Sequence, residues 1–413
     1  MSKPIRIALW VLFALTSVAV VRVATGAHDL DSPRSLQAAL VATCPILLAA
    51  LGGLWSERAG VVNLGLEGQM LLGTWGAAFF TYHVDPYVGL LGGIAFGVLG
   101  GLVHALATVT FGVDHIVSGV ALNIIALGLT TFLAEAFFTD LSSDRGTGGP
   151  RQLTGIDKPA DLTVPGISEL AGDLAGKHWF LVSDLASIVA TLTTNLSVVT
   201  ILALALVVVT AVVLWRTTFG LRLRSCGENP QAAESLGINV IRHKYAAVLI
   251  SGGLAGLGGA YLALVSSPGF TTNQTGGRGY IGLAAMIFGN WRPTGVLMGS
   301  GMFGYTDSLR HRQADAIHAL LLLVALWLLV VVVVRVVRLV RAGELKAGLL
   351  RGPAILLVAA VLFGVWFATT EDVPREFTAM TPYLATLLVL AFAAQRLRMP
   401  AADGQIYRKG SAG

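Results

Sequence analysis

The residues best suited to chemistry lie in the stretch Ser56–Gln69, which separates two apolar runs. Its polar members are two acids, one base and two amides: Glu57, Glu67, Arg58, Asn63 and Gln69. Charged groups are costly at membrane depth, so they mark polar helix ends or line a protected cavity. Glycines within the stretch let the backbone turn or approach a neighbour closely. The pattern predicts an interrupted membrane segment.

A second polar stretch, Gly227–Ile238, lies in a basic loop. Asn229 and Pro230 suit the start of a helix, since proline fits the first helical turn. Gly237 suits its end. The spacing predicts a short helix that docks a soluble partner; the alternative is an ordinary surface loop.

The elements that carry these stretches are membrane helices. The chain has 413 residues, of which 55% are hydrophobic and 12% charged, and this composition is typical of a polytopic membrane protein. Runs of about twenty apolar residues predict spans. We expect an all-α fold of roughly ten to twelve transmembrane or re-entrant helices, at 5–24, 36–54, 62–82, 87–111, 116–138, 196–215, 244–265, 280–290, 294–309, 316–334, 353–369 and 380–395. The run 280–290 is too short to cross and predicts half of a broken element.

Basic residues predict the orientation, because loops rich in Lys and Arg stay in the cytoplasm. The loop 216–244, a loop with Arg335, Arg338 and Arg341, and the tail after residue 396 should face inward. The long loop 139–195 is acidic and should face outward. Arg310–Arg312 falls outside against this rule. Glycines spaced four apart at 93, 97 and 101, and at 252 and 256, predict closely packed helices.

Several kinds of chemistry have no motif in this chain. It has no phosphate-binding loop of the G-x-x-x-x-G-K-[ST] type, no H-E-x-x-H and no nucleophile elbow. The histidines lack metal-binding spacing. The basic residues cluster between apolar runs, which argues against nucleic-acid binding. We therefore expect a transport subunit, with no enzyme activity, metal or cofactor on this chain.

Five motifs together carry a resemblance to a known family. They are ERAGVVNLGLEGQM from Glu57, SGVALNIIALGL at 118–129, GENPQAAESLGI at 227–238, GGRGYIGLAAMIFGNWRP at 276–293, and the end, MTPYLATLLVLAF at 380–392 with GQIYRKG at 404–410. The chain resembles the inner-membrane permeases of nucleoside-type ABC importers, a group that also carries simple sugars and branched-chain amino acids. The resemblance covers 36–312 and 377–410. Between 313 and 376 the chain has two additional apolar runs, which we interpret as lipid-facing; a partner surface is the alternative.

The resemblance implies one permease domain over 1–413 in the bacterial cytoplasmic membrane, with several partners. These are membrane lipid, an ABC ATPase subunit that binds ATP, a second and different permease, and an external solute-binding lipoprotein. The family's coupling residues correspond here to Glu228, Asn229, Pro230, Ala232, Ala233 and Gly237. We expect Ala233→Arg to uncouple the complex without unfolding it, since the small alanines suit a tight socket.

Candidates for the substrate path come from polar and aromatic residues in the spans. Asn63 and Glu67, four apart, share a helical face; they either bond to each other or face the path. Asn123 and Ser118 either contact solute or join helices. Aromatic residues can stack a flat base, although they more often pack or anchor; the candidates are Trp75, Tyr280 and Phe288.

Three alternatives remain open. The same architecture can carry a simple sugar or a branched-chain amino acid. An ion-driven secondary transporter needs acids near the midplane, and only Glu67 and Glu135 are candidates. A structural or channel-like subunit would be insensitive to changes at Asn229 and Pro230.

Overall fold

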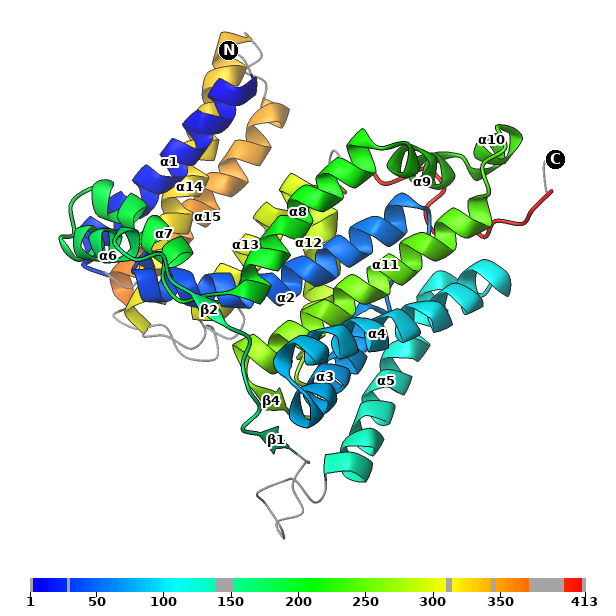
Figure 1. The fold of residues 1–413 in the computed structure, drawn as a ribbon. Helices are drawn as coiled ribbons and strands as arrows, with labels where there is room; N and C mark the ends of the chain where they lie inside the picture. Colours follow the sequence, from blue (N-terminus) through cyan, green and yellow to red (C-terminus); the bar gives the residue numbers. More distant parts are fainter. Residues whose placement is uncertain are drawn as a thin grey trace. The chain divides into compact units, whose positions relative to one another are not determined.

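A computed structural model describes residues 3–27, 30–138, 152–309, 314–342, 347–370 and 397–410 (Figure 1). These residues are mainly helical, and seven of the described helices are long and apolar enough to cross a membrane. The all-α, polytopic prediction is therefore confirmed. The described chain forms two compact units, each assembled from separate segments. The single permease domain over 1–413 stays a prediction.

One unit comprises residues 40–162, 195–305 and 384–413. It contains most of α2 (Pro33–Arg58) and of α13 (Pro293–Leu309), together with α3 (Leu66–His83), α4 (Pro86–Ala105), α5 (His115–Phe138), α8 (Val198–Arg216), α9 (Thr218–Glu228), α10 (Pro230–Ser235), α11 (Val240–Tyr261) and α12 (Arg278–Phe288). A single π-helical turn continues α4 and another continues α11, at Leu106–Thr110 and Leu262–Ser266. Two short antiparallel pairs close the loops: β1 (Leu153–Thr154) with β4 (Gly269–Phe270), and β2 (Asp161–Leu162) with β3 (Leu196–Ser197).

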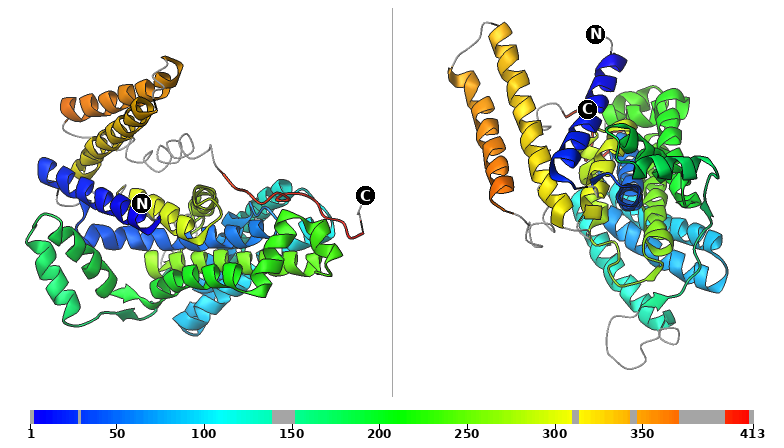
Figure 2. Two further views of the ribbon diagram at one scale, coloured as in Figure 1. Left: turned by 90° about the horizontal axis from the view of Figure 1, so that it is seen from above. Right: turned by 90° about the vertical axis from the view of Figure 1, so that its left-hand side faces the viewer.

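The other unit comprises residues 1–39, 163–194 and 306–383. It contains α1 (Lys3–Thr25), α6 (Ile167–Gly176), α7 (Val182–Thr193), α14 (Ala314–Arg341) and α15 (Ala347–Thr369). Helices α14 and α15 pack side by side, and α1 lies against α14 (Figure 2). The Trp327 indole donates to the Ser17 hydroxyl at 3.0 Å. The two additional apolar runs therefore form a helical hairpin.

Several predicted boundaries were wrong. The segment 139–195 contains α6, α7 and two short strands as well as loop. Arg335, Arg338 and Arg341 lie on the last turns of α14 because its apolar run continues between them. Helix α3 begins at Leu66, four residues later than predicted span 62–82. The span 380–395 and Arg310–Arg312 lie outside the described residues. The short 280–290 element is confirmed as α12, which has 11 residues.

Closely packed glycines bring α3, α4 and α11 together (Figure 1). A Cβ atom added to Gly97 of α4 would lie 2.2 Å from the Gly252 carbonyl oxygen and 2.5 Å from the Gly256 Cα. One added to Gly73 of α3 would lie 2.3 Å from the Gly256 oxygen. The predicted glycine packing is confirmed, and small residues permit this backbone contact between membrane helices.

We expect Gly97→Val to destabilise the protein by about 3 kcal/mol, because overpacking against backbone atoms cannot be relieved by a rotamer change. Thermal unfolding in detergent would measure the loss. Gly128→Val is the matched control, since nothing lies within 4 Å of a Cβ added at that exposed position of α5. Equal melting temperatures for the two variants would contradict the close contact.

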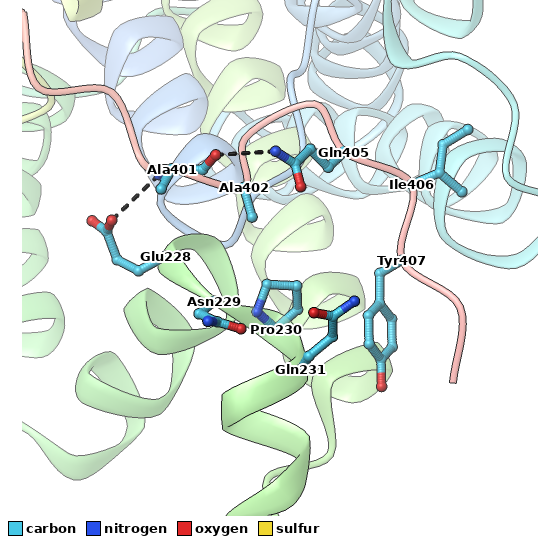
Figure 3. Close-up of a pocket in the computed structure, with 9 residues that line it drawn as sticks. All are labelled: Glu228, Asn229, Pro230, Gln231, Ala401, Ala402, Gln405, Ile406 and Tyr407. Carbon is cyan, nitrogen blue, oxygen red and sulfur yellow. Dashed lines mark hydrogen bonds between the residues drawn. The ribbon is translucent and has the colours of Figure 1, made fainter. Parts of the chain in front are cut away.

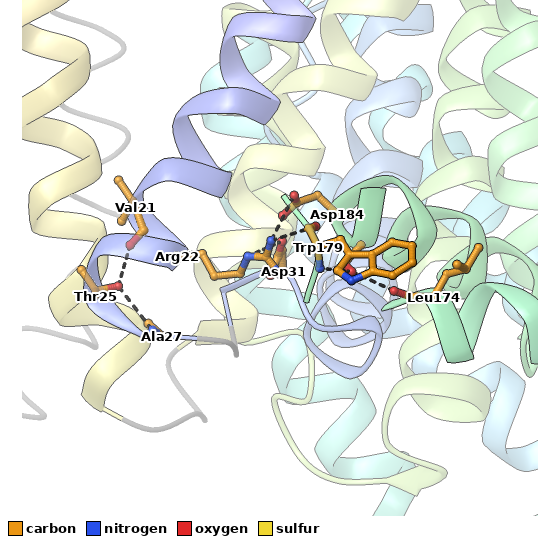
Figure 4. Close-up of polar contacts among 9 residues, drawn as sticks. Val21, Arg22, Thr25, Ala27, Asp31, Leu174, Trp179 and Asp184 are labelled. Carbon is orange, nitrogen blue, oxygen red and sulfur yellow. Dashed lines mark hydrogen bonds and ion pairs between the residues drawn. The ribbon is translucent and has the colours of Figure 1, made fainter. Parts of the chain in front are cut away.

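A buried charge cluster joins α1 to α7 and to the segment before α2 (Figure 4). The Arg22 guanidinium lies 3.3 Å from the Asp184 carboxylate and 3.6 Å from that of Asp31. Thus two carboxylates share one base. Burial and the neighbouring Asp184 raise the pKa of Asp31 to about 7, while Arg22 opposes the rise.

This cluster should make stability depend on pH. Between about pH 4, near the usual aspartate pKa, and pH 7, the native protein retains a proton at Asp31 that the unfolded chain loses. The free energy of unfolding therefore falls as pH rises through this window. We expect Asp31→Asn to remove this part of the dependence and to raise the melting temperature at pH 8. A parallel decline of parent and variant between pH 5 and 8 would contradict the assignment.

Candidate functional site

The polar stretch after α2 is a buried break in the helical structure. Residues 59–65 are not helical, and Ala59, Val61 and Asn63 are buried. The Ser56 hydroxyl donates to the Val61 carbonyl at 2.6 Å, which closes the turn. Non-helical backbone at membrane depth is tolerated only where protein or a cavity surrounds it. The local prediction of an interrupted segment agrees with this geometry.

The side chain of Asn63 holds the non-helical segment 59–65 in place through hydrogen bonds. Its amide nitrogen donates to Gln69 Oε1 and to Ser251 Oγ, both at 2.9 Å, and its oxygen accepts from the Gly65 amide at 3.1 Å. The side chain is fully buried. The predicted option of an Asn63–Glu67 bond was wrong, because Gln69 occupies the amide and Glu67 has other partners.

Glu67 accepts three hydrogen bonds around the start of α12. Its Oε1 accepts from the Thr275 hydroxyl at 2.5 Å and from the Gly277 amide at 2.8 Å, and its Oε2 accepts from the Gly279 amide at 2.6 Å. The first amides of a helix lack partners within the helix and favour a negative group. Glu67 therefore holds the N-terminus of the short helix α12 against the N-terminus of α3.

Asn123 of α5 completes this junction. Its oxygen accepts from the Gly68 amide at 2.7 Å, and its nitrogen donates to the Leu64 carbonyl and the Tyr280 hydroxyl, both at 2.9 Å. Asn123 is buried, whereas Tyr280 is 48% exposed. We call the group Asn63, Glu67, Asn123, Thr275 and Tyr280 the α3–α12 junction. It offers an exposed aromatic ring backed by buried amide and carboxylate groups.

Ser118 lies on another side of the break. Its hydroxyl is 2.9 Å from His104 Nδ1, and His104 Nε2 is 3.0 Å from the Val62 carbonyl. His115 Nδ1 accepts from the Val62 amide at 3.3 Å. No sequence pattern distinguishes His104, which follows a glycine-rich apolar run and has no second ligand at characteristic spacing.

Trp75 and Phe288 are not brought to the junction. Trp75 is buried among aromatic side chains, with ring centroids 4.9 Å from Phe79 and 5.2 Å from Phe96. Phe288 stacks on Phe303 at 5.6 Å. In this structure both residues pack the helices, and Tyr280 is the predicted aromatic candidate with an exposed ring.

The polar C-terminal end of α2 contacts the second polar stretch, Gly227–Ile238, through side chains. Glu57 Oε2 accepts from the Trp291 indole at 2.6 Å, and Arg58 donates to the Trp291 carbonyl at 2.6 Å. Arg58 also lies 3.8 Å from the Glu228 carboxylate at the end of α9. Glu57 and Arg58 thus both contact Trp291, one at its indole and the other at its carbonyl, and Arg58 alone reaches Glu228.

The predicted short helix is present as α10. The Asn229 side chain caps it by accepting from the Ala232 amide at 2.9 Å, and Pro230 occupies its first turn. Gly237 follows the helix with φ +79°, a conformation that favours glycine. The local prediction is confirmed at the level of structure, while the docking role stays a prediction.

The two alanines of α10 face different surroundings. Ala232 is exposed, and Leu236 beyond the helix is 82% exposed. Ala233 is only 2% exposed and packs in a cluster with Cys226, Val240 and Tyr407. The expectation that Ala233→Arg leaves the fold intact was wrong, because arginine would have to enter this cluster.

A pocket of about 260 Å³ lies between α10 and the C-terminal segment (Figure 3). It is lined by Glu228, Asn229, Pro230, Gln231, Ala401, Ala402, Gln405, Ile406 and Tyr407. The C-terminal residues carry the motif GQIYRKG, but no local sequence pattern relates this motif to a helix more than 150 positions earlier.

The comparisons with known proteins agree on one family. The family model described as branched-chain amino acid transport system / permease component matches residues 35–333. The guanosine ABC transporter permease protein NupQ of Bacillus subtilis is 32% identical over 381 residues, which is 90% of this chain and 96% of that protein. The nucleoside ABC transporter permease protein NupC of Lactococcus lactis is 33% identical over 377 residues, 90% of this chain and 95% of that protein.

A more partial match is the putative glucose ABC transporter permease protein TsgC13 of Haloferax volcanii, 34% identical over 286 residues, 69% of this chain and 79% of that protein. No solved structure matches the chain.

Proposed function

This chain belongs to the family of branched-chain amino acid transport system permease components, and we propose that it is one of two permease subunits of an ATP-driven nucleoside importer. The observation that carries the proposal is the similarity to permeases named for guanosine and nucleosides over 95–96% of their length. ATP would bind and be hydrolysed on a separate subunit. The importer would operate in a bacterial cytoplasmic membrane.

The α3–α12 junction is our proposed part of the substrate path. Tyr280 offers a half-exposed ring for stacking a base. Asn123 and Glu67 hold that ring's helix through the contacts at Tyr280, Thr275 and Gly279. Short helices at membrane depth are a recurrent device for solute sites. ATP-driven closure of the motor subunits would shift the population between outward-open and inward-open states.

Three partners follow from the proposal. An ABC ATPase would dock at α10, and an external solute-binding lipoprotein would deliver the nucleoside. The second permease would be a different chain, because the Lactococcus strain has two nucleoside ABC transporter permease proteins, NupC and NupB, that are both similar to this one.

Uptake assays test the substrate class. Cells that lack this chain should lose accumulation of radiolabelled guanosine and adenosine and regain it when the chain is restored. The same assay is repeated with glucose, because one relative is named for glucose. It is then repeated with leucine. Restoration of glucose or leucine uptake alone would replace the nucleoside proposal. Uptake that survives ATP depletion but not an ionophore would favour the ion-driven alternative.

A further inference from the structure

The C-terminal residues 400–410, which we call the C-terminal strap, are hydrogen-bonded to the end of α9. The Ala402 amide donates to the Gly227 carbonyl at 2.9 Å, and the Ala401 amide donates to Glu228 Oε2 at 3.3 Å (Figure 3). The strap contains GQIYRKG, a motif that the proposed substrate path does not use.

The strap also contacts the end of α2 through backbone atoms. A Cβ atom added at Gly60 would lie 3.1 Å from both the Ala402 oxygen and the Gly227 Cα. One added at Gly227 would lie 2.4 Å from the Arg58 carbonyl oxygen. Ala402 itself is 4% exposed. The ends of α2 and α9 and the strap therefore meet in close backbone contact, tightest between Gly227 and Arg58.

Asp403 of the strap interacts with Glu57 and with the bases Lys244 and Arg58. Burial raises the pKa of Asp403 to about 7, while Glu57, Lys244 and Arg58 oppose the rise. Lys244 also donates to the Gly60 carbonyl at 3.1 Å. The strap is thereby linked to the ends of α2 and α11, two of the helices long enough to cross the membrane.

The residues of the strap that follow Asp403 pack against α10. Tyr407 contacts the cluster of Cys226, Ala233 and Val240, and the Gly410 amide donates to Glu234 Oε2 at 3.5 Å. Tyr407 lines the pocket of Figure 3 and also a second pocket of about 260 Å³ beside Gly237 and Lys409. Ile406, on the wall of the first pocket, is 49% exposed.

We propose that the C-terminal strap forms half of the docking surface for the ATPase subunit, with α10 forming the other half, and links α10 to α2 and α11. This inference rests on the proposed function. The fitting partner is a protein surface that inserts apolar side chains beside Pro230 and Ile406 and covers Leu236. Glu228 lines the first pocket, and Glu234 and Lys409 line the second, so the charges around the exposed apolar side chains are mixed.

The test compares Ile406→Asp with Met399→Asp in the full chain, co-expressed with its ATPase and second permease. Met399 is 55% exposed, precedes the strap and does not line the pocket. We expect Ile406→Asp to weaken ATPase binding by about tenfold or more, as for a charge placed in an interface centre. Met399→Asp should bind like the parent. Melting temperatures of both variants show whether the permease stays folded; if Ile406→Asp unfolds, Gln405→Arg at the same pocket replaces it.

The outcomes separate this inference from the proposed function. Suppose that a folded Ile406→Asp or Gln405→Arg variant binds the ATPase with the parent's affinity while Ala232→Arg loses binding. This result would overturn the role of the strap and leave docking at α10 intact. If the strap variants and Ala232→Arg all bind the ATPase with the parent's affinity, the proposed docking surface would be overturned as a whole. A parent chain that retains no ATPase would overturn the proposed function and this inference with it.

Discussion

An arginine in place of Ala232 should abolish ATP-driven uptake without unfolding the chain. Ala232 is exposed on α10, and its amide is already satisfied by the Asn229 cap. A long charged side chain there leaves the chain's own packing intact and obstructs a partner seated on the helix. Burying an unpaired charge at such a contact should lower ATPase affinity by roughly thirtyfold or more.

The measurement is nucleoside uptake into proteoliposomes together with the amount of ATPase that co-purifies. Ala232→Ser is the matched control and should behave like the parent. Ala233→Arg should instead lower the melting temperature, because Ala233 lies in the buried cluster with Val240 and Tyr407. Full uptake by a folded Ala232→Arg protein would remove α10 as the docking element.

Glu67→Gln should cause the second large loss of nucleoside uptake. Glutamine has one acceptor oxygen and a donor group, so its NH₂ would face either the Gly279 amide or the Gly277 amide together with the Thr275 hydroxyl. Loss of charge-assisted bonds at this buried site should cost about 2–3 kcal/mol. The start of α12 and Tyr280 would then shift, and we expect uptake to fall at least about tenfold.

Thr275→Val provides the graded control for Glu67→Gln. It removes one of the three hydrogen bonds and preserves the carboxylate, so its effect should be near 1 kcal/mol. The two variants are compared by thermal unfolding in detergent and by uptake. Glu67→Gln with the parent's stability and uptake would show that the carboxylate does not position α12.

Local chemistry explains which parts of the site could be predicted from the sequence. Asn229, Pro230 and Gly237 act on their own backbone neighbours, so their spacing was enough to predict α10. The partners of Glu67 are 208 to 212 positions away, and nothing in residues 56–69 indicates them. Ala233 shows the same limit, since its burial depends on Tyr407 at the far end of the chain.

The same distinction between local patterns and distant contacts applies to the fold. Long apolar runs predicted the helices long enough to span, and glycine spacing predicted close helix packing but not that α4 and α11 are partners. The amphipathic helices α6 and α7 were missed because the prediction for segment 139–195 used its acidic charge and not its helical periodicity. Trp75 had the right type for base stacking, but its neighbours Phe79 and Phe96 enclose it.

Purification of the tagged chain in mild detergent, with identification of every co-purifying protein, tests the central claim most directly. We predict an ATPase with a phosphate-binding loop and a second, different permease, and a complex that accumulates nucleoside in proteoliposomes only when ATP is supplied. A chain that purifies alone or only with copies of itself, and whose uptake follows an ion gradient, would contradict the importer account.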